Sequence, residues 1–68
     1  MAEFNREKIA DNLKQLRGTR TQKEVADAIG VTSMAISQYE QGERIPSDTI
    51  KIKLANYFNV PVENIFFA

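Results

Sequence analysis

Met34, Ser37, Gln38 and Gln41 have short, uncharged side chains that recur at helical spacing. At about 100° per residue, they share one side of a helix over residues 32–41. A glutamine amide can form a bidentate pair with adenine, a serine hydroxyl bonds to several bases, and a thioether can pack on the methyl group of thymine. This chemistry suits the base edges in a DNA groove, although an ordinary solvated helix face would carry the same residue types.

Other kinds of chemistry lack the residues that they need. The sequence has no cysteine, no histidine, no cluster of carboxylates and no glycine-rich phosphate loop. Disulfides, thiolate metal sites and histidine-based acid–base catalysis are therefore excluded. We expect that the protein is not an enzyme, that it needs no metal or other cofactor, and that it has no small-molecule substrate.

Length and composition indicate one folded domain, over residues 1–68. Of the 68 residues, 43% are hydrophobic and 26% are charged, which is typical of a soluble globular protein. No segment resembles a signal peptide or approaches the ~20 apolar residues of a membrane helix. Because cysteine-free small proteins suit a reducing compartment, we expect a cytoplasmic protein without membrane contact. Nine Lys and Arg balance nine Asp and Glu, so a basic docking face would require opposite charges on different faces.

Capping residues and glycines divide the chain into five predicted helices. Asn5, Thr32 and Ser47 are good N-caps, and Thr21 with Glu24 forms a capping box. Gly18 and Gly30 would end the first two helices in the left-handed conformation, and Gly42 would end the third. The helices are expected at residues 5–17, 22–29, 32–41, 48–58 and 62–67. No segment alternates with the period of a strand, so we predict an all-α bundle.

The second and third predicted helices are joined by a tight turn at Gly30, which is the arrangement of a helix-turn-helix. Helical spacing also predicts the inward-facing residues of three helices. They are Val25, Ala28 and Ile29 in the second helix, Thr32, Ala35, Ile36 and Tyr39 in the third, and Ile50, Leu54, Tyr57 and Phe58 in the fourth. The second helix of such a pair typically enters the major groove of DNA.

Four segments together resemble the lambda-repressor-like helix-turn-helix family, also called the XRE family. The segments are TQKEVA at 21–26, IGVT at 29–32, ISQYEQG at 36–42 and IP at 45–46. The resemblance extends in order over about residues 9–67. It implies a compact five-helix bundle that binds double-stranded DNA as a homodimer on a palindromic operator, with helix 32–41 in the major groove. The two recognition helices would lie about one DNA turn, ~34 Å, apart.

The resemblance also implies roles for individual residues. Base contacts would come from the recognition helix, at Ser33, Met34, Ser37, Gln38 and Gln41. Contacts to the DNA backbone or the minor groove would come from Gln22, Thr32, Arg44, Thr49 and Lys51. Arg17 and Glu40 occupy the positions of an ion pair that braces the first helix against the recognition helix, and we interpret this pair as scaffold.

Apolar residues outside the predicted core suggest a subunit contact. Ile52 projects away from the inward face of the fourth helix, and Phe66 and Phe67 crowd the C-terminus. We expect Ile52, Phe66 and Phe67 to lie at a dimer interface, which agrees with the resemblance. In the alternative, both phenylalanines fold back on the first helix and Ile52 is an isolated surface residue.

The sequence predicts a sequence-specific DNA-binding transcriptional regulator, with repression as the expected activity. An alternative is a protein-interaction module, such as an antitoxin or a subunit of a repressor complex, because exposed apolar residues would also suit a protein partner. A salt titration of DNA binding distinguishes these hypotheses, since phosphate contacts make affinity depend steeply on salt.

Overall fold

Each of the first four helices begins at a side chain that satisfies a free backbone N–H. The computed structural model describes residues 5–66, and in it Asn5, Thr32 and Ser47 accept from the backbone N–H three residues later, at 3.0, 3.1 and 3.4 Å. Thr21 and Glu24 form the complete capping box, with 3.0 Å for both bonds. All four predicted N-caps are therefore confirmed.

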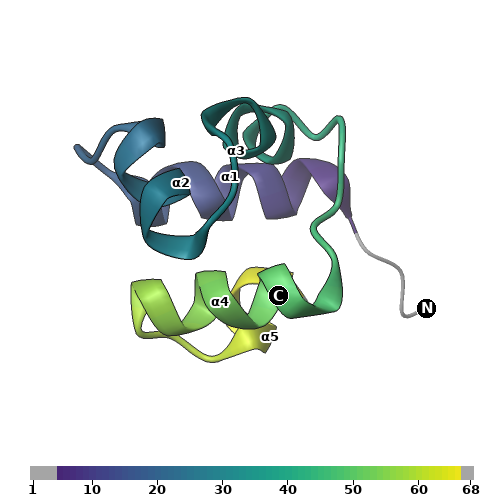
Figure 1. The fold of residues 1–68 in the computed structure, drawn as a ribbon. Helices are drawn as coiled ribbons and strands as arrows, with labels where there is room; N and C mark the ends of the chain where they lie inside the picture. The colour runs from purple at the N-terminus through teal and green to yellow at the C-terminus, as the bar shows by residue number, and fades with distance from the viewer. Residues whose placement is uncertain (1–4, 67–68) are drawn as a thin grey trace.

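Five helices result, and the described residues contain no strand. They are α1 (Arg6–Arg17), α2 (Gln22–Ile29), α3 (Ser33–Glu40), α4 (Asp48–Phe58) and α5 (Val62–Phe66). In Figure 1, α3 lies at the top of the molecule across α1, with α2 beside it, and α4 and α5 form the lower part. The all-α, five-helix prediction is confirmed. None of the helices within residues 5–66 has the length and apolar character needed to cross a membrane.

Gly30 makes the turn between α2 and α3 tight. Its backbone is left-handed, with φ 77° and ψ 34°, and its N–H donates to the carbonyl of Ala26 at 2.9 Å. Only Val31 then separates it from the N-cap of α3, as the sequence predicts. Gly18 also ends α1, but its φ of 59° and ψ of −124° lie outside the left-handed helical region that we expected. Both conformations favour glycine because a Cβ would be strained at positive φ.

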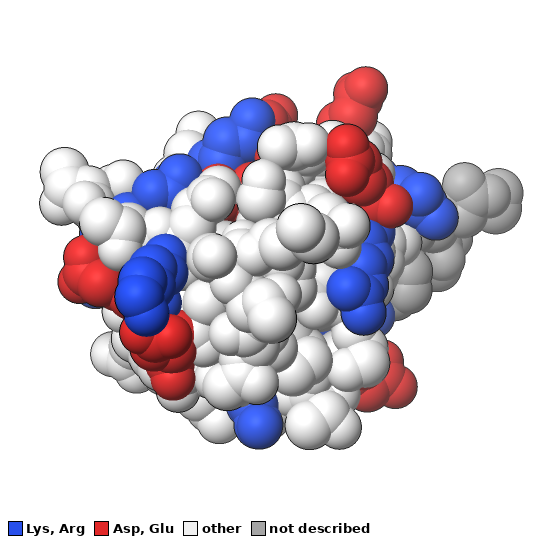
Figure 2. Space-filling view, turned by 45° about the horizontal axis from the view of Figure 1, so that its top comes forward, with Lys and Arg blue, Asp and Glu red and all other residues white. Residues whose placement is uncertain are grey.

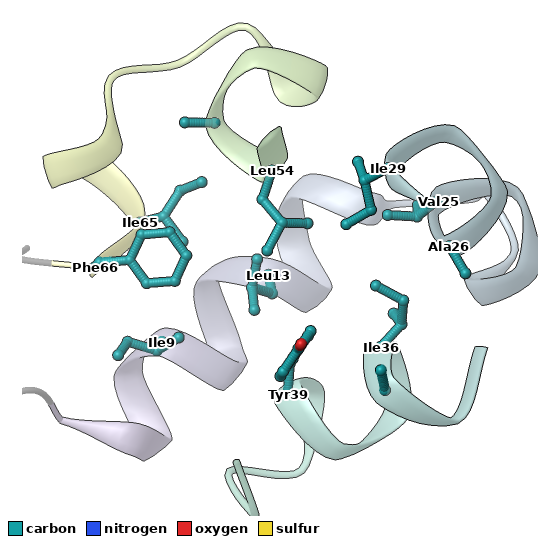
Figure 3. Packing of buried hydrophobic residues seen from close by; sticks show 12 residues of the cluster. Ile9, Leu13, Val25, Ala26, Ile29, Ile36, Tyr39, Leu54, Ile65 and Phe66 are labelled. Carbon is teal, nitrogen blue, oxygen red and sulfur yellow. The ribbon is translucent and has the colours of Figure 1, made fainter. Parts of the chain in front are cut away.

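The core lies between all five helices (Figure 3). Its large members are Ile9, Leu13, Val25, Ile29, Ile36, Tyr39, Leu54, Ile65 and Phe66. Two inward-facing predictions are wrong: Ala28 is exposed while Ala26 is buried, and Thr32 is exposed because it serves as the surface cap of α3. Ala26 and Ala28 lie about equally far to either side of the line through Val25 and Ile29 on α2, so helical spacing could not decide which of them the neighbouring helices cover.

The C-terminal helix folds back on α1, and this corrects the expectation that Phe66 lies at a dimer interface. Phe66 is 2% exposed and belongs to the core, so its side chain is not available on the surface of a single chain. The side-chain amide of Asn12 on α1 donates to the carbonyl of Ile65 at 3.0 Å and holds α5 in place. Phe67 lies outside the described residues. Ile52 is 54% exposed, as predicted.

Candidate nucleic-acid interface

The outward side of α3 is open to solvent. Ala35, Ile36 and Tyr39 bury the inner side of the helix, while Met34 on the outer side is 69% exposed. Other residues predicted to contact bases share this open side or its ends: Ser33 and Gln41 are exposed, and Ser37 and Gln38 are half-buried. The division of α3 into a buried and an outward face therefore agrees with the helical spacing.

The surface around α3 carries its charges at the rim. Figure 2 turns the top of Figure 1, where α3 lies, toward the viewer. The centre of this face is free of charged side chains, and Lys, Arg, Asp and Glu surround it. Uncharged polar groups suit base edges, whereas long cationic side chains seek phosphates. The face thus has the distribution of chemistry that a groove contact requires, although the whole chain is neutral.

Polar side chains on this face are bonded to one another. The amide of Gln41 donates to the hydroxyl of Ser37 at 2.9 Å, one helical turn earlier. Arg44, in the linker to α4, donates from Nη1 to Oε1 of Gln38 at 3.4 Å. The Arg44 guanidinium also lies 5.8 Å from the centre of the Tyr39 ring, which is a cation–π distance. These contacts orient three of the base-reading candidates, Ser37, Gln38 and Gln41.

A buried carboxylate locks α3 against the two helices before it. Glu40, the last residue of α3, is 4% exposed and accepts from Arg17 on α1, Nε to Oε2 at 2.6 Å and Nη2 to Oε1 at 3.0 Å. Its Oε1 also accepts from the amide of Gln22 on α2 at 3.1 Å. The hydrogen bond to Glu40 raises the pKa of the Arg17 guanidinium. The brace that the resemblance implied between α1 and the recognition helix is therefore present.

Gln22 has a role that sequence reasoning missed. It begins α2, where the resemblance implies a phosphate contact, but its side-chain amide is directed to Glu40. One amide hydrogen is thereby used within the protein, and a glutamine amide carries two. No local pattern could have revealed this bond, because the two residues are 18 positions apart in the sequence.

Thr49 and Lys51, both predicted to hold phosphate, have different environments. Thr49 is exposed in the first turn of α4. Lys51 is 7% exposed, with its ammonium 3.6 Å from Asp48 Oδ1 and 5.6 Å from the centre of the Phe66 ring. A phosphate contact at Lys51 would have to come from a side chain that is largely buried, because this face of α4 packs against α5.

Residues 5–66 contain no group of three or more His, Cys, Asp or Glu side chains that could hold a metal ion. The outward face of α3, the Arg44 linker and the first turn of α4 are instead the places where the predicted site residues remain accessible. Ser33, Met34 and Gln41 on α3, Arg44 in the linker and Thr49 on α4 are all exposed.

Two comparisons with known proteins agree with this geometry. A family model described as "Helix-turn-helix" matches residues 13–65 of the chain. The chain is also 25% identical, over 61 residues, to an uncharacterized HTH-type transcriptional regulator, YgzD, of Bacillus subtilis (strain 168). This similarity covers 87% of the present chain and 92% of that relative. The region matched by the family model contains α2, the tight turn and α3.

Proposed function

Because this chain belongs to the XRE, or lambda-repressor-like, family of helix-turn-helix proteins and is a DNA-binding transcriptional regulator, we propose that it represses transcription as a homodimer on a palindromic operator. Such a regulator acts where the DNA lies, and the proposal places it in the cytoplasm. Repression follows when an occupied operator overlaps the site that RNA polymerase needs.

One observation carries the proposal: α3 presents an uncharged side, made mostly of hydrogen-bonding residues, that the described residues 5–66 leave open to solvent. On this side Met34, in the first turn of α3, is 69% exposed. In the proposed complex, base contacts come from Ser33, Met34, Ser37, Gln38 and Gln41. The brace of Arg17 and Gln22 on Glu40 supports it, because a helix held at a fixed angle loses less freedom on entering the groove.

Contacts to the phosphates flank this helix. Thr32 at the start of α3 and Thr49 at the start of α4 offer exposed hydroxyls, and Gln22 retains one amide hydrogen. Hydroxyl and amide contacts release fewer counterions than cations do. For this neutral chain we therefore propose that affinity depends on salt less steeply than for strongly basic repressors, whose log-log slope steepens by about one unit for each cation–phosphate contact.

Selecting bound DNA from a random pool tests the function directly. We expect the protein to enrich a palindrome whose half-sites lie about one DNA turn apart. Gln38→Ala should remove the preference at one base position in each half-site, reducing discrimination there by roughly ten-fold, since a base contact is worth ~1–3 kcal/mol. The measurement is the enriched base frequency at each position.

Gln15→Ala is the matched control, because Gln15 is an exposed glutamine on α1. It should leave every position of the selected sequence unchanged. Failure of the wild-type protein to enrich any sequence, together with binding that does not respond to salt, would contradict the proposal. That result would favour a module that binds another protein.

The proposed dimer provides a second test. Ile52 is a large apolar residue on α4 with 54% of its surface exposed, and a second copy would cover it. Ile52→Asp should weaken dimerisation at least ten-fold, because it places a charge in an apolar contact. Sedimentation of wild type and variant over a range of concentrations measures this. An unchanged dimerisation constant would exclude Ile52 from the interface.

A further inference from the structure

The contact between Arg44 and Gln38 bears on which base this protein reads. We infer that Arg44 orients the amide of Gln38 so that Gln38 reads guanine rather than adenine. This inference rests on the proposed function, since it concerns the specificity of the same helix. It assigns to Arg44 a positioning role that differs from the phosphate or minor-groove contact expected from the sequence.

The chemistry of the two side chains determines which atom of Gln38 faces Arg44. A guanidinium carries only hydrogen-bond donors, so its partner in an amide must be the oxygen. Arg44 Nη1 lies 3.4 Å from Gln38 Oε1. The neighbouring guanidinium therefore determines that the oxygen of the Gln38 amide, and not its nitrogen, faces Arg44.

Arg44 is itself held in place by a fixed part of the fold. Its guanidinium carbon lies 5.8 Å from the ring centre of Tyr39, the residue that follows Gln38 in α3. Tyr39 is buried in the core and cannot move with the linker. A cation over a ring of this kind gains attraction from the electron-rich face. The tyrosine thus positions the arginine, and the arginine positions the glutamine.

With one lone pair of Oε1 bonded to Arg44 and the donor-only guanidinium beside the other, Gln38 offers the groove mainly its Nε2 and the two hydrogens on it. A glutamine reads adenine by accepting from N6 and donating to N7, which requires the oxygen. Guanine presents two acceptors, N7 and O6, on the same edge. An amide that mainly donates matches guanine, whereas at adenine the N6 amino group would have to share Oε1 with the positively charged guanidinium.

The test is selection from a random DNA pool with wild type, Arg44→Met, Arg44→Lys and Gln38→Ala. Gln38→Ala identifies the base position that Gln38 reads. At that position the wild type should prefer guanine, and Arg44→Met should lower the guanine-to-adenine ratio roughly ten-fold, because the freed oxygen then accepts from adenine N6. Arg44→Lys retains a donor and should retain the preference for guanine.

Lys53→Met is the matched control, because it removes one positive charge from an exposed side chain on α4. It should leave the base preference unchanged. If Arg44→Met weakens binding equally at all sequences, or if the wild type prefers adenine at the position sensitive to Gln38→Ala, the inference is overturned while the regulator function stands. If the wild type enriches no sequence, both fail.

Discussion

Replacing Leu54 by alanine is expected to cost about 3 kcal/mol of unfolding free energy, because it removes buried methyl groups and leaves a cavity. Leu54 is 1% exposed and borders the same small central cavity as Leu13, Val25 and Ile36, so its loss affects the packing of four helices. A domain of this size has only about 3–5 kcal/mol of net stability. The variant should therefore unfold at much lower urea concentration, as measured by circular dichroism.

Ile52→Ala is the control for this prediction, since both residues lie on α4 and lose a similar side chain. Ile52 is 54% exposed, so the monomer should lose less than about 1 kcal/mol. Measurements at several protein concentrations separate this effect from any loss of dimer stability. Equal destabilisation by the two substitutions would show that Leu54 is not a central packing residue.

Arg17→Ala is expected to destabilise the fold by about 3 kcal/mol, because it leaves the buried Glu40 carboxylate without its cation. The hydrogen bond that Gln22 donates to Glu40 remains, but the Gln22 amide is neutral and cannot balance the charge of the carboxylate. DNA affinity should also fall in the fraction that is still folded, since α3 loses its brace to α1. Urea denaturation measures the first effect, and titration of operator DNA at a temperature where the variant is folded measures the second.

The exposed pair of Lys23 and Asp27 provides the matched comparison. Its nitrogen–oxygen distance, 2.9 Å, is close to the 2.6 Å of the Arg17–Glu40 pair, but its side chains are 77% and 65% exposed. Lys23→Ala should change stability by no more than about 0.5 kcal/mol, because solvent screens such a pair. A loss of equal size in Lys23→Ala and Arg17→Ala would refute the importance of burial at Glu40.

The positions of the helices and the two sides of α3 could be predicted from the sequence. N-caps such as Thr21 and Thr32 act on backbone groups three residues away, and helical spacing places Met34 and Tyr39 on opposite sides of one helix. These interactions span less than two helical turns, so the residues that make them are neighbours in any fold that keeps the helix. The family resemblance added the ion pair of Arg17 and Glu40, whose partners are 23 residues apart.

Only the tertiary structure decided which of several equivalent residues is covered. Phe66 and Lys51 are buried because α5 packs on α1 and α4, and Ala26 is buried in place of Ala28 because of the helices beside α2. The bonds from Gln22 to Glu40 and from Arg44 to Gln38 likewise depend on the angles between elements. Helix packing sets those angles through contacts between residues distant in the chain, and no local pattern encodes them.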